Sequence, residues 1–524
     1  MKKNVLAMSI AALIGGLSLA GGASAAVINT TNADAAVPLV VNKDGKGHIL
    51  LVPYYNASAD NTTVINLVNS DTSNGKALKV RFRGANNSDD VFDFTLFLSP
   101  GDVWSGAVVH NAGSAALVTA DNSCVLPANA GINSGTPVNF VTSRLGGAGA
   151  KGTLEGYVEV LTMADIPVAT NTTGGLYKAI KHVNGTAPCF GTSEYNTLLA
   201  NLATEPATEA AANNIGLYAP TTGMFANWTI INVKNVSSWG GDATAVEART
   251  AADIAARGNI VYFPQLNDAV TAGIQSVTAD PLLTTGKVVP RLYDLPDLST
   301  PYATAPGVAA AVTQADALTK SLAVTAVQNE FITSASVAGS TDWVFSMPTR
   351  RYHVALDYAA TSVGGLPIEY RVFRPTSPSA YFIADNTSVD SSDARRAQAG
   401  ERSICVSLGS NALDYRDRSE RTPAPGGFVI SPNQPAAGMS FCGEASVLSF
   451  NSATSNVLGS TIGQNGITLT SGFNEGWASI NTSNGGLGFP ILGAAFQKFL
   501  NVGTSGVQGN FGSVWAHRFN RPAP

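Results

Sequence analysis

The chain has 524 residues, of which only 13% are charged, and its formal net charge at pH 7 is −5. Nucleic-acid-binding proteins usually carry a surplus of basic residues, so this balance argues against nucleic acid as a partner. The low charge density, with 52 glycines and many other small residues, favours an extracellular β protein over a highly charged cytosolic enzyme.

The first 25 residues have the composition of a secretory signal peptide. Lys2 and Lys3 precede an apolar run from Val5 to Ala20, and Ala23-Ser24-Ala25 provides a small-residue cleavage site. The competing interpretation is a membrane anchor, but the run is short for a bilayer span, which needs ~20 apolar residues. No later run reaches spanning length, so we predict an exported protein, at the cell surface or extracellular, without a transmembrane segment after removal of residues 1–25.

Period-two patterning dominates the segment 47–109, which contains five strand-like runs separated by turn-forming residues. In the run 77–83, three apolar residues alternate with Lys79, Arg81 and Arg83, so the positive charges share one side of an extended chain. This pattern predicts a half-buried strand whose charged face is open to solvent and is a candidate interface with an acidic neighbour. Similar runs along the chain predict a mainly β fold of antiparallel, sandwich-like sheets with a few helices.

The remaining chain divides into three predicted parts. An N-terminal β domain spans 26–165, and a loop or helix insertion, or a domain junction, spans 166–224. A C-terminal β-rich domain spans 225–524. Within it, the segment near 307–332 is rich in Ala, Leu and Gln and predicts a helix that covers one sheet face.

Four cysteines, two in each half of the chain, are expected to form disulfides in an oxidising compartment. They are Cys124, Cys189, Cys405 and Cys442. Four cysteines allow three pairings, and we predict the two local ones, Cys124 with Cys189 and Cys405 with Cys442. Zinc is the alternative, but the sequence contains no CxxC pair and no histidine at ligand spacing.

A second candidate interface is the charged segment that includes Asp414, Arg416, Asp417 and Arg418. Carboxylates and arginines in this arrangement would suit a sugar or an adjoining subunit. The alternative is a solvated loop of alternating charges, in which each exposed pair contributes only ~0–1 kcal/mol. Between subunits such pairs steer register more than they add affinity.

Motifs of the common catalytic sites are absent. HExxH, GxSxG and a Walker-type loop do not occur, and no two of the five histidines lie at metal-ligand spacing. His353 with Asp357 could form an acid/base dyad, but a strand histidine on a polar face explains the same pattern. We therefore predict no catalytic residue and no enzymatic activity.

Calcium binding and sugar stacking leave weaker signals. The pairs Asp89 and Asp90, and Asp390 and Asp393, offer oxygen ligands for calcium, although paired oxygens in turns mostly stabilise the turns themselves. Apart from calcium, no cofactor is expected. Among the six tryptophans, Trp239 in the sequence SSWGGD is the best candidate for an exposed ring that could stack on a sugar.

Several segments carry a family resemblance: TIINV, GDATAVEA, YFPQ, TDWVFSMPTRRYH, CGEASVLSFN and GLGFPILGAAFQKFLN. They resemble secreted proteobacterial proteins known as cell surface proteins, which include surface-layer proteins of comamonad-type bacteria. The resemblance implies an outer-surface location and a structural or assembly role, and it implies no catalytic residue.

We therefore predict an exported structural protein that associates laterally with itself in a surface layer or extracellular filament. Outer-membrane polysaccharide is a further candidate partner. One alternative is a secreted module that binds carbohydrate or a host surface, and another is a hydrolase with a dispersed active site.

Overall fold

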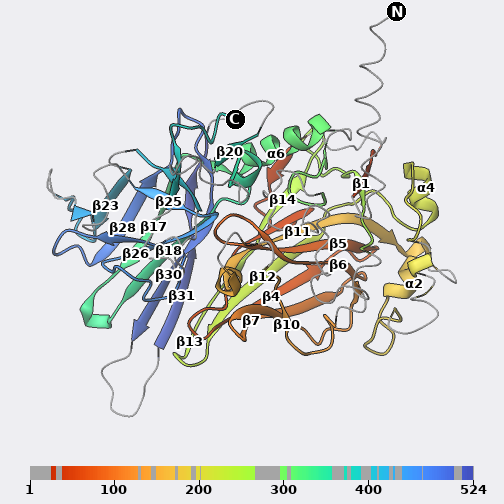
Figure 1. Cartoon of the computed structure of the whole chain (residues 1–524), viewed down its shortest axis with the longest axis horizontal. Coiled ribbons are helices and arrows are strands. Elements are labelled where there is room, and N and C mark those ends of the chain that lie inside the picture. Colours follow the sequence, from red (N-terminus) through yellow and green to blue (C-terminus); the bar gives the residue numbers. More distant parts are fainter. Residues whose placement is uncertain are drawn as a thin grey trace, which may run out of the picture.

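The computed structural model describes residues 25–30, 38–127, 131–142, 145, 149–170, 175–189, 196, 198–200, 202–265, 295–303, 308–356, 371–374, 379–390, 403–409, 412–423, 429–430, 439–462, 464–500 and 510–522. The fold is mainly β, as predicted, and two sandwiches of antiparallel sheets lie side by side (Figure 1). No helix in the described part of the chain is long and apolar enough to span a membrane.

Two sheets form the first sandwich. The seven-stranded sheet has the order β2 (Leu39–Val41), β14 (Thr244–Ala248), β3 (Ile49–Asn56), β11 (Glu155–Pro167), β5 (Asn74–Gly84), β6 (Asp90–Leu98) and β9 (Cys124–Leu126). The six-stranded sheet has the order β10 (Val138–Asn139), β8 (Ser114–Val118), β7 (Val103–Asn111), β4 (Asn61–Asn69), β12 (Met224–Asn232) and β13 (Ser237–Asp242). Alternate residues of facing strands, such as Leu78 and Leu67, meet in the core between the sheets.

The second sandwich also has two main sheets. Its six-stranded sheet has the order β24 (Val429–Ile430), β27 (Gln464–Thr468), β26 (Ala445–Phe450), β18 (Ser340–Ser346), β30 (Leu492–Leu500) and β31 (Asn510–Ala516). Its four-stranded sheet has the order β23 (Leu413–Asp417), β28 (Glu475–Asn481), β17 (Ala326–Ile332) and β32 (Arg518–Asn520). Only β26 and β27 pair in parallel among the described ladders of this sandwich.

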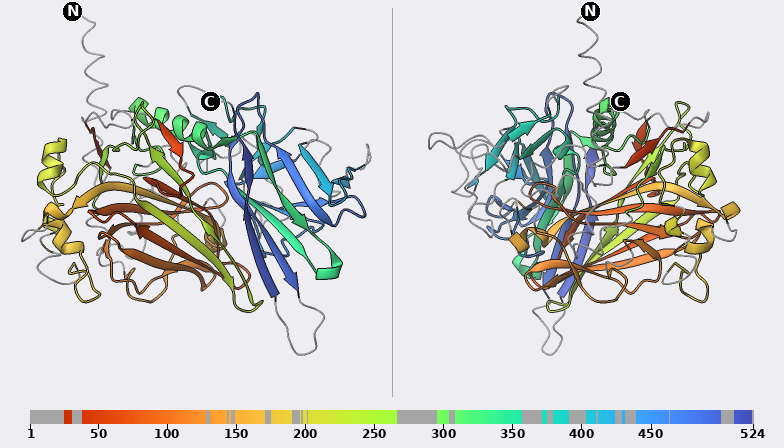
Figure 2. Two further views of the ribbon diagram at one scale, coloured as in Figure 1. Left: turned by 180° about the vertical axis from the view of Figure 1, so that it is seen from behind. Right: turned by 45° about the vertical axis from the view of Figure 1, so that its right-hand side comes forward.

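The six-stranded sheet of the second sandwich is shared between two cores. Val344 and Phe496 point into the core of the first sandwich, whereas their neighbours Trp343 and Ala495 point into the core of the second. The ring of Phe496 lies 5.7 Å from that of Trp228 on β12. Because successive strand residues point to opposite faces, one sheet closes both cores, and Figure 2 shows its upright strands against the first sandwich.

Shorter elements fill the margins. Small sheets are formed by β1 (Ala26–Ile28) with β15 (Ile260–Tyr262), β16 (Ala323–Val324) with β29 (Phe489–Pro490), β19 (Val354–Leu356) with β20 (Arg371–Phe373), and β21 (Thr387–Asp390) with β22 (Ser403–Ser407) and β25 (Ser440–Cys442). The described α-helices include α2 (Leu176–Ile180), α4 (Glu209–Asn214) and α6 (Val308–Leu322), and the 3₁₀ turns include η3 (Gly149–Thr153), η4 (Val168–Thr170), η6 (Ala335–Val337) and η7 (Arg350–Tyr352). Ala315, Leu318 and Leu322 of α6 pack with residues of β2, β3 and β14 on the outer face of the seven-stranded sheet.

Two predicted boundaries need correction. Strands β12 and β14 pair with β4 and β3, so the first sandwich extends to Ala248, and a division at residue 225 would cut both of its sheets. The predicted helix at 307–332 ends at Leu322, and its second half forms β16 and β17. In β17, Val327 and Phe331 alternate with polar residues and point into the second core, and this burial outweighs the local helix propensity.

Both disulfides have the predicted local pairing. Cys124 bonds to Cys189 and joins β9 to the segment after α2, while Cys405 bonds to Cys442 and joins β22 to its neighbour β25. No cysteine of the chain is free. The bonds agree with an oxidising compartment.

Candidate functional site

The charged face of β5, which we predicted to be open to solvent, is buried. Lys79, Arg81 and Arg83 have no exposed surface. Lys79 Nζ lies 2.8 Å from Asp93 Oδ1, and Arg83 Nε lies 3.3 Å from Glu159 Oε1, so neighbouring strands supply the counter-charges. The predicted interface with an acidic neighbouring molecule is therefore wrong, because the acidic neighbours belong to the same sheet.

Segments from distant parts of the sequence cover this face. Gln265 accepts a hydrogen bond from Lys79 Nζ at 3.0 Å. Asp297 Oδ2 lies 3.1 Å from Arg351 Nη1 of η7 and 3.9 Å from Arg83 Nη2. The charges thus form a closed layer between the seven-stranded sheet and the chain that crosses it.

Burial and pairing shift the titration of this layer. Burial lowers the pKa of Lys79 to about 8, although Asp93 opposes the shift. Burial alone would raise the pKa of the Asp297 carboxyl, but Arg351 and Arg83 outweigh it and hold the pKa below its ordinary value. Fully enclosed ion pairs can favour one packing arrangement over others. Because this layer is enclosed, substrates do not reach it, and we assign it a structural role.

A second buried ion pair joins the two sandwiches. Arg350 Nε lies 3.3 Å from Glu444 Oε1, and Arg350 Nη2 donates to the Asn86 carbonyl at 3.3 Å. The backbone N–H of Glu444 donates to the Ala85 carbonyl at 2.7 Å. The turn after β5 is thereby fastened to the start of β26.

The described histidines of the cores do not form acid/base sites. Burial lowers the pKa values of His48, His353 and His517 to about 3. The His353 ring, which we considered as half of a catalytic dyad, is enclosed and contacts Thr319 Oγ1 at 2.8 Å. Its proposed partner, Asp357, lies outside the described residues. The burial of His353 disfavours the dyad, because a general base must reach the proton that it removes.

The second candidate interface lies on an edge strand. Asp414 and Arg416 project from the outer face of β23 and form an ion pair with each other. The side chain of Arg418 is 74% exposed and pairs with Glu475 at 2.7 Å. Asp417 is instead buried and accepts the backbone N–H of Arg421 at 2.9 Å, so it shapes the turn and is unsuited to contact a partner.

The tryptophans divide into two groups. Four are buried in the cores: Trp104, Trp228, Trp239 and Trp343. Trp239, predicted to be exposed, donates its indole N–H to the Gln497 carbonyl of β30 at 2.8 Å. Its edge strand β13 packs against β31, so Trp239 lies at the joint between the sandwiches. Trp477 and Trp515 are 43% and 50% exposed, and they line one cavity of about 210 Å³.

This cavity lies where β17, β28, β31 and β32 approach one another. Glu330 of β17 is directly opposite Trp477 of β28, and Gln328 of β17 is opposite Arg518 of β32. The sequence-based prediction singled out Trp239 and did not group Trp477 with Trp515. The available signal was the run Trp477-Ala478-Ser479-Ile480, in which Trp477 and Ser479 share one face of a strand and the apolar Ala478 and Ile480 share the other.

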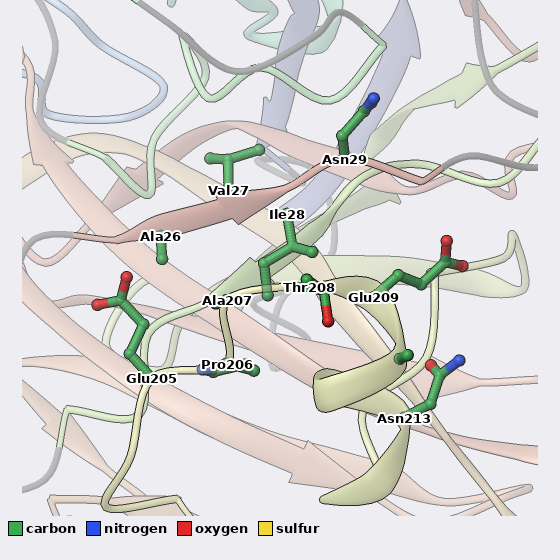
Figure 3. Close-up of a pocket in the computed structure, with 11 residues that line it drawn as sticks. Ala26, Val27, Ile28, Asn29, Glu205, Pro206, Ala207, Thr208, Glu209 and Asn213 are labelled. Carbon is green, nitrogen blue, oxygen red and sulfur yellow. The ribbon is translucent and has the colours of Figure 1, made fainter.

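A larger cavity, of about 770 Å³, lies beside β1 and the start of α4. Figure 3 shows Ile28 directed toward Thr208, with Glu205 and Glu209 on opposite sides of the view. Thr208 accepts the N–H of Ala211 at 3.2 Å and caps α4. The described residues that line this cavity include no histidine, no cysteine and no basic side chain.

The suggested calcium ligands are not assembled into a cluster in the described part of the chain. Asp90 is buried 3.4 Å from Arg81, which gives it a cationic neighbour. The Asp390 side chain and Asp393 lie outside what the structure describes. Among the described residues, no group of three or more histidine, cysteine, aspartate or glutamate side chains could hold a metal ion.

Comparisons with protein-family models, curated proteins and solved structures found no match. Two exposed features of the described residues, the edge strand β23 and the tryptophan-lined cavity, are the basis for a proposed function.

Proposed function

We propose that the protein is an exported structural component of the cell surface that associates laterally with copies of itself through β23. The observation that carries this proposal is the position of the charged pair Asp414 and Arg416 on the outermost strand of a sheet. Within the part of the chain that the structure describes, β23 pairs only with β28. An edge strand can be completed by a strand from another molecule.

The backbone of β23 has the orientation that such pairing requires. The Asn481 N–H donates to the Ala412 carbonyl at 2.7 Å, which makes these two residues a hydrogen-bonded pair. Because antiparallel ladders alternate, the N–H and C=O groups of Leu413 and Tyr415 then point away from β28. On this outer side the Tyr415 carbonyl accepts a hydrogen bond from Arg416 Nη1 at 3.0 Å, which a strand from another molecule would replace.

The charges favour a second copy in one register. If two β23 strands pair antiparallel about a two-fold axis at Tyr415, Asp414 of each copy faces Arg416 of the other. Opposite charges directly across a ladder are favourable, and like charges there are unfavourable. The same charges also disfavour pairing of β23 with an unrelated strand that lacks matching charges. They therefore select both the partner and the register of the pairing.

Two further features support a surface role. The disulfides are those of a protein that folds in an oxidising compartment. The shared sheet packs the two sandwiches against each other through side chains on both of its faces, which suits a repeating unit of a layer. The hydrolase alternative loses support because His353 is enclosed.

Sedimentation velocity of the mature protein tests the interface. Asp414→Arg and Arg416→Asp each place like charges opposite one another, so we expect either change to weaken self-association at least tenfold. The double change Asp414→Arg with Arg416→Asp restores opposite charges and should restore association. Lys234→Glu is the control, because the Lys234 side chain is 75% exposed in the turn between β12 and β13.

A protein that stays monomeric at high concentration, or a double variant no better than the single ones, would contradict self-association through β23. Electron microscopy of the native envelope tests the cellular role. We expect an ordered layer or filament that disappears when the protein is removed, and an unchanged surface would reject the assignment.

A further inference from the structure

The two tryptophans that the cores leave exposed come from different sheets and line the same cavity. Trp477 lies on β28 of the four-stranded sheet, and Trp515 lies on β31 of the six-stranded sheet. The other lining residues are mostly polar: Gln328, Asn329, Glu330, Ala516 and Arg518. We call this cavity the tryptophan groove.

Buried groups hold the wall formed by Trp515 in place. Asn329 Nδ2 donates to the Trp515 carbonyl at 2.9 Å and lies 3.0 Å from His517 Nδ1. His517 Nε2 faces the Val344 carbonyl at 3.0 Å and must donate to it, so Nδ1 is the acceptor for Asn329. Both hydrogens of the Asn329 amide are therefore engaged behind Trp515.

The opposite wall is fixed in a similar way. Trp343, in the core, donates its indole N–H to the Glu330 carbonyl at 3.0 Å, and Asn329 Oδ1 accepts the Glu330 N–H at 2.9 Å. The Arg416 guanidinium lies 6.0 Å from the centre of the Trp477 ring and contacts it as a cation on an aromatic surface. The groove is thus held open by strands whose positions the core determines, which reduces the entropy lost when a ligand binds.

We propose that the tryptophan groove binds one residue of a neutral saccharide chain. An indole ring offers an apolar surface to the C–H face of a sugar, and the groove has two such rings. Glu330 accepts hydrogen bonds, Arg518 donates them, and Gln328 does both, which matches sugar hydroxyl groups. The lining has one acidic and one basic side chain, and this balance favours a neutral ligand over a charged polymer.

The size of the groove agrees with this class of ligand. Pockets for drug-sized molecules have volumes of ~300–1,000 Å³, so a cavity of about 210 Å³ accepts a single ring rather than a whole oligosaccharide. A bound chain would place one ring between the tryptophans and continue over the surface. This site goes beyond the proposed self-association, because its lining comes from β17, β28, β31 and β32 and includes no residue of β23.

The chain provides a matched control. Phe511 lies on the same strand as Trp515, is 61% exposed, and does not line the groove. Replacement of Phe511 removes a comparable exposed ring and leaves the groove intact. Loss of general surface hydrophobicity would therefore affect Phe511→Ala and Trp515→Ala equally, whereas loss of a binding site affects only the latter.

The test uses the mature protein on an array of neutral oligosaccharides built from glucose, galactose, mannose and N-acetylglucosamine. We expect binding to at least one of these chains, weakened at least tenfold by Trp477→Ala or Trp515→Ala and unchanged by Phe511→Ala. Trp515→Phe should retain part of the affinity. Thermal unfolding should be unchanged in each variant, because the replaced rings are not part of a core.

Two results would overturn the proposal: no binding to any neutral glycan, or equal loss of binding in the tryptophan and Phe511 variants. Sedimentation velocity of the same variants separates the two proposals. If the tryptophan variants lose self-association and the parent protein binds no glycan, the groove is a protein contact. If glycan binding survives in an Asp414→Arg variant that is monomeric, the groove acts independently of the β23 interface, because Asp414 does not line the groove.

Discussion

Replacement of Arg83 by methionine tests whether the charged face of β5 is structural. Arg83 Nε lies 3.3 Å from Glu159 Oε1, Nη1 donates to the Ser88 carbonyl at 3.3 Å, and Nη2 lies 3.9 Å from Asp297. Methionine can fill much of the same volume, but it leaves Glu159 without its nearest cation. The change therefore isolates the loss of the charge from the loss of packing.

The structure sets the expected magnitude. At 3.3 Å and an effective dielectric constant of ~20, the attraction between Arg83 and Glu159 is ~5 kcal/mol. Removal of one partner of a buried pair typically costs ~3–5 kcal/mol, because the other charge stays enclosed. Whole proteins are stable by only ~5–15 kcal/mol, so Arg83→Met should remove a large part of the free energy of unfolding.

Urea unfolding of the mature protein, followed by tryptophan fluorescence, measures this loss. The matched control is Arg418→Met, because the Arg418 side chain is 74% exposed and its pair with Glu475 lies in solvent. We expect a large shift of the unfolding midpoint for Arg83→Met and little shift for Arg418→Met. The double variant Arg83→Met with Glu159→Leu should recover part of the stability. The second change removes the Glu159 carboxylate that Arg83→Met would otherwise leave buried and unpaired. Equal midpoints for Arg83→Met and Arg418→Met would refute the assignment of Arg83 to a buried network.

Three further predictions concern protonation, covalent links and processing. His353 and two other enclosed histidines have pKa values lowered by burial to about 3, against 6.5 in the unfolded chain. The unfolded state therefore binds protons first, and stability should fall by up to ~1.4 kcal/mol per pH unit for each histidine as pH decreases below 6.5; equal urea midpoints at pH 7 and pH 5 would contradict this. Replacement of Cys124 and Cys189 by alanine opens a link across 65 residues and should cost ~2–4 kcal/mol, measured in the same unfolding assay, whereas an unchanged midpoint would show that the link adds no stability. Mass spectrometry of the exported protein should find Ala26, the first residue of β1, at the amino terminus, and a retained leader would reject the predicted cleavage.

The sequence predicted the strands better than their surroundings. The alternation in β5 correctly separates two faces, because side chains of a strand alternate whatever covers them. It could not show that Gln265, Asp297 and η7 cover the charged face, since these segments lie more than 180 residues away. A charged strand face therefore predicts exposure only when nothing distant packs on it.

The same limit applies to β17 and to Trp239. Local composition favoured a helix through residue 332. The burial of Val327 and Phe331 in the second core, however, stabilises the strand by more than helix propensity would stabilise a helix. SSWGGD has the composition of an exposed turn, yet Trp239 meets Gln497 of a strand more than 250 residues later. The tryptophan groove depends on the approach of residues 330, 477 and 515, and no local pattern encodes that approach.

The shared sheet has a mechanical consequence. Because Trp343 and Val344 are anchored in different cores, tension applied to one sandwich reaches the other through side chains packed on both faces of β18. Within the described residues the joint is made by paired strands, since β18 pairs with β26 and β30 along its length. A pull across the molecule must therefore break core packing before the sandwiches can separate, and we expect single-molecule stretching to show one high-force event for this joint in place of an early, compliant extension.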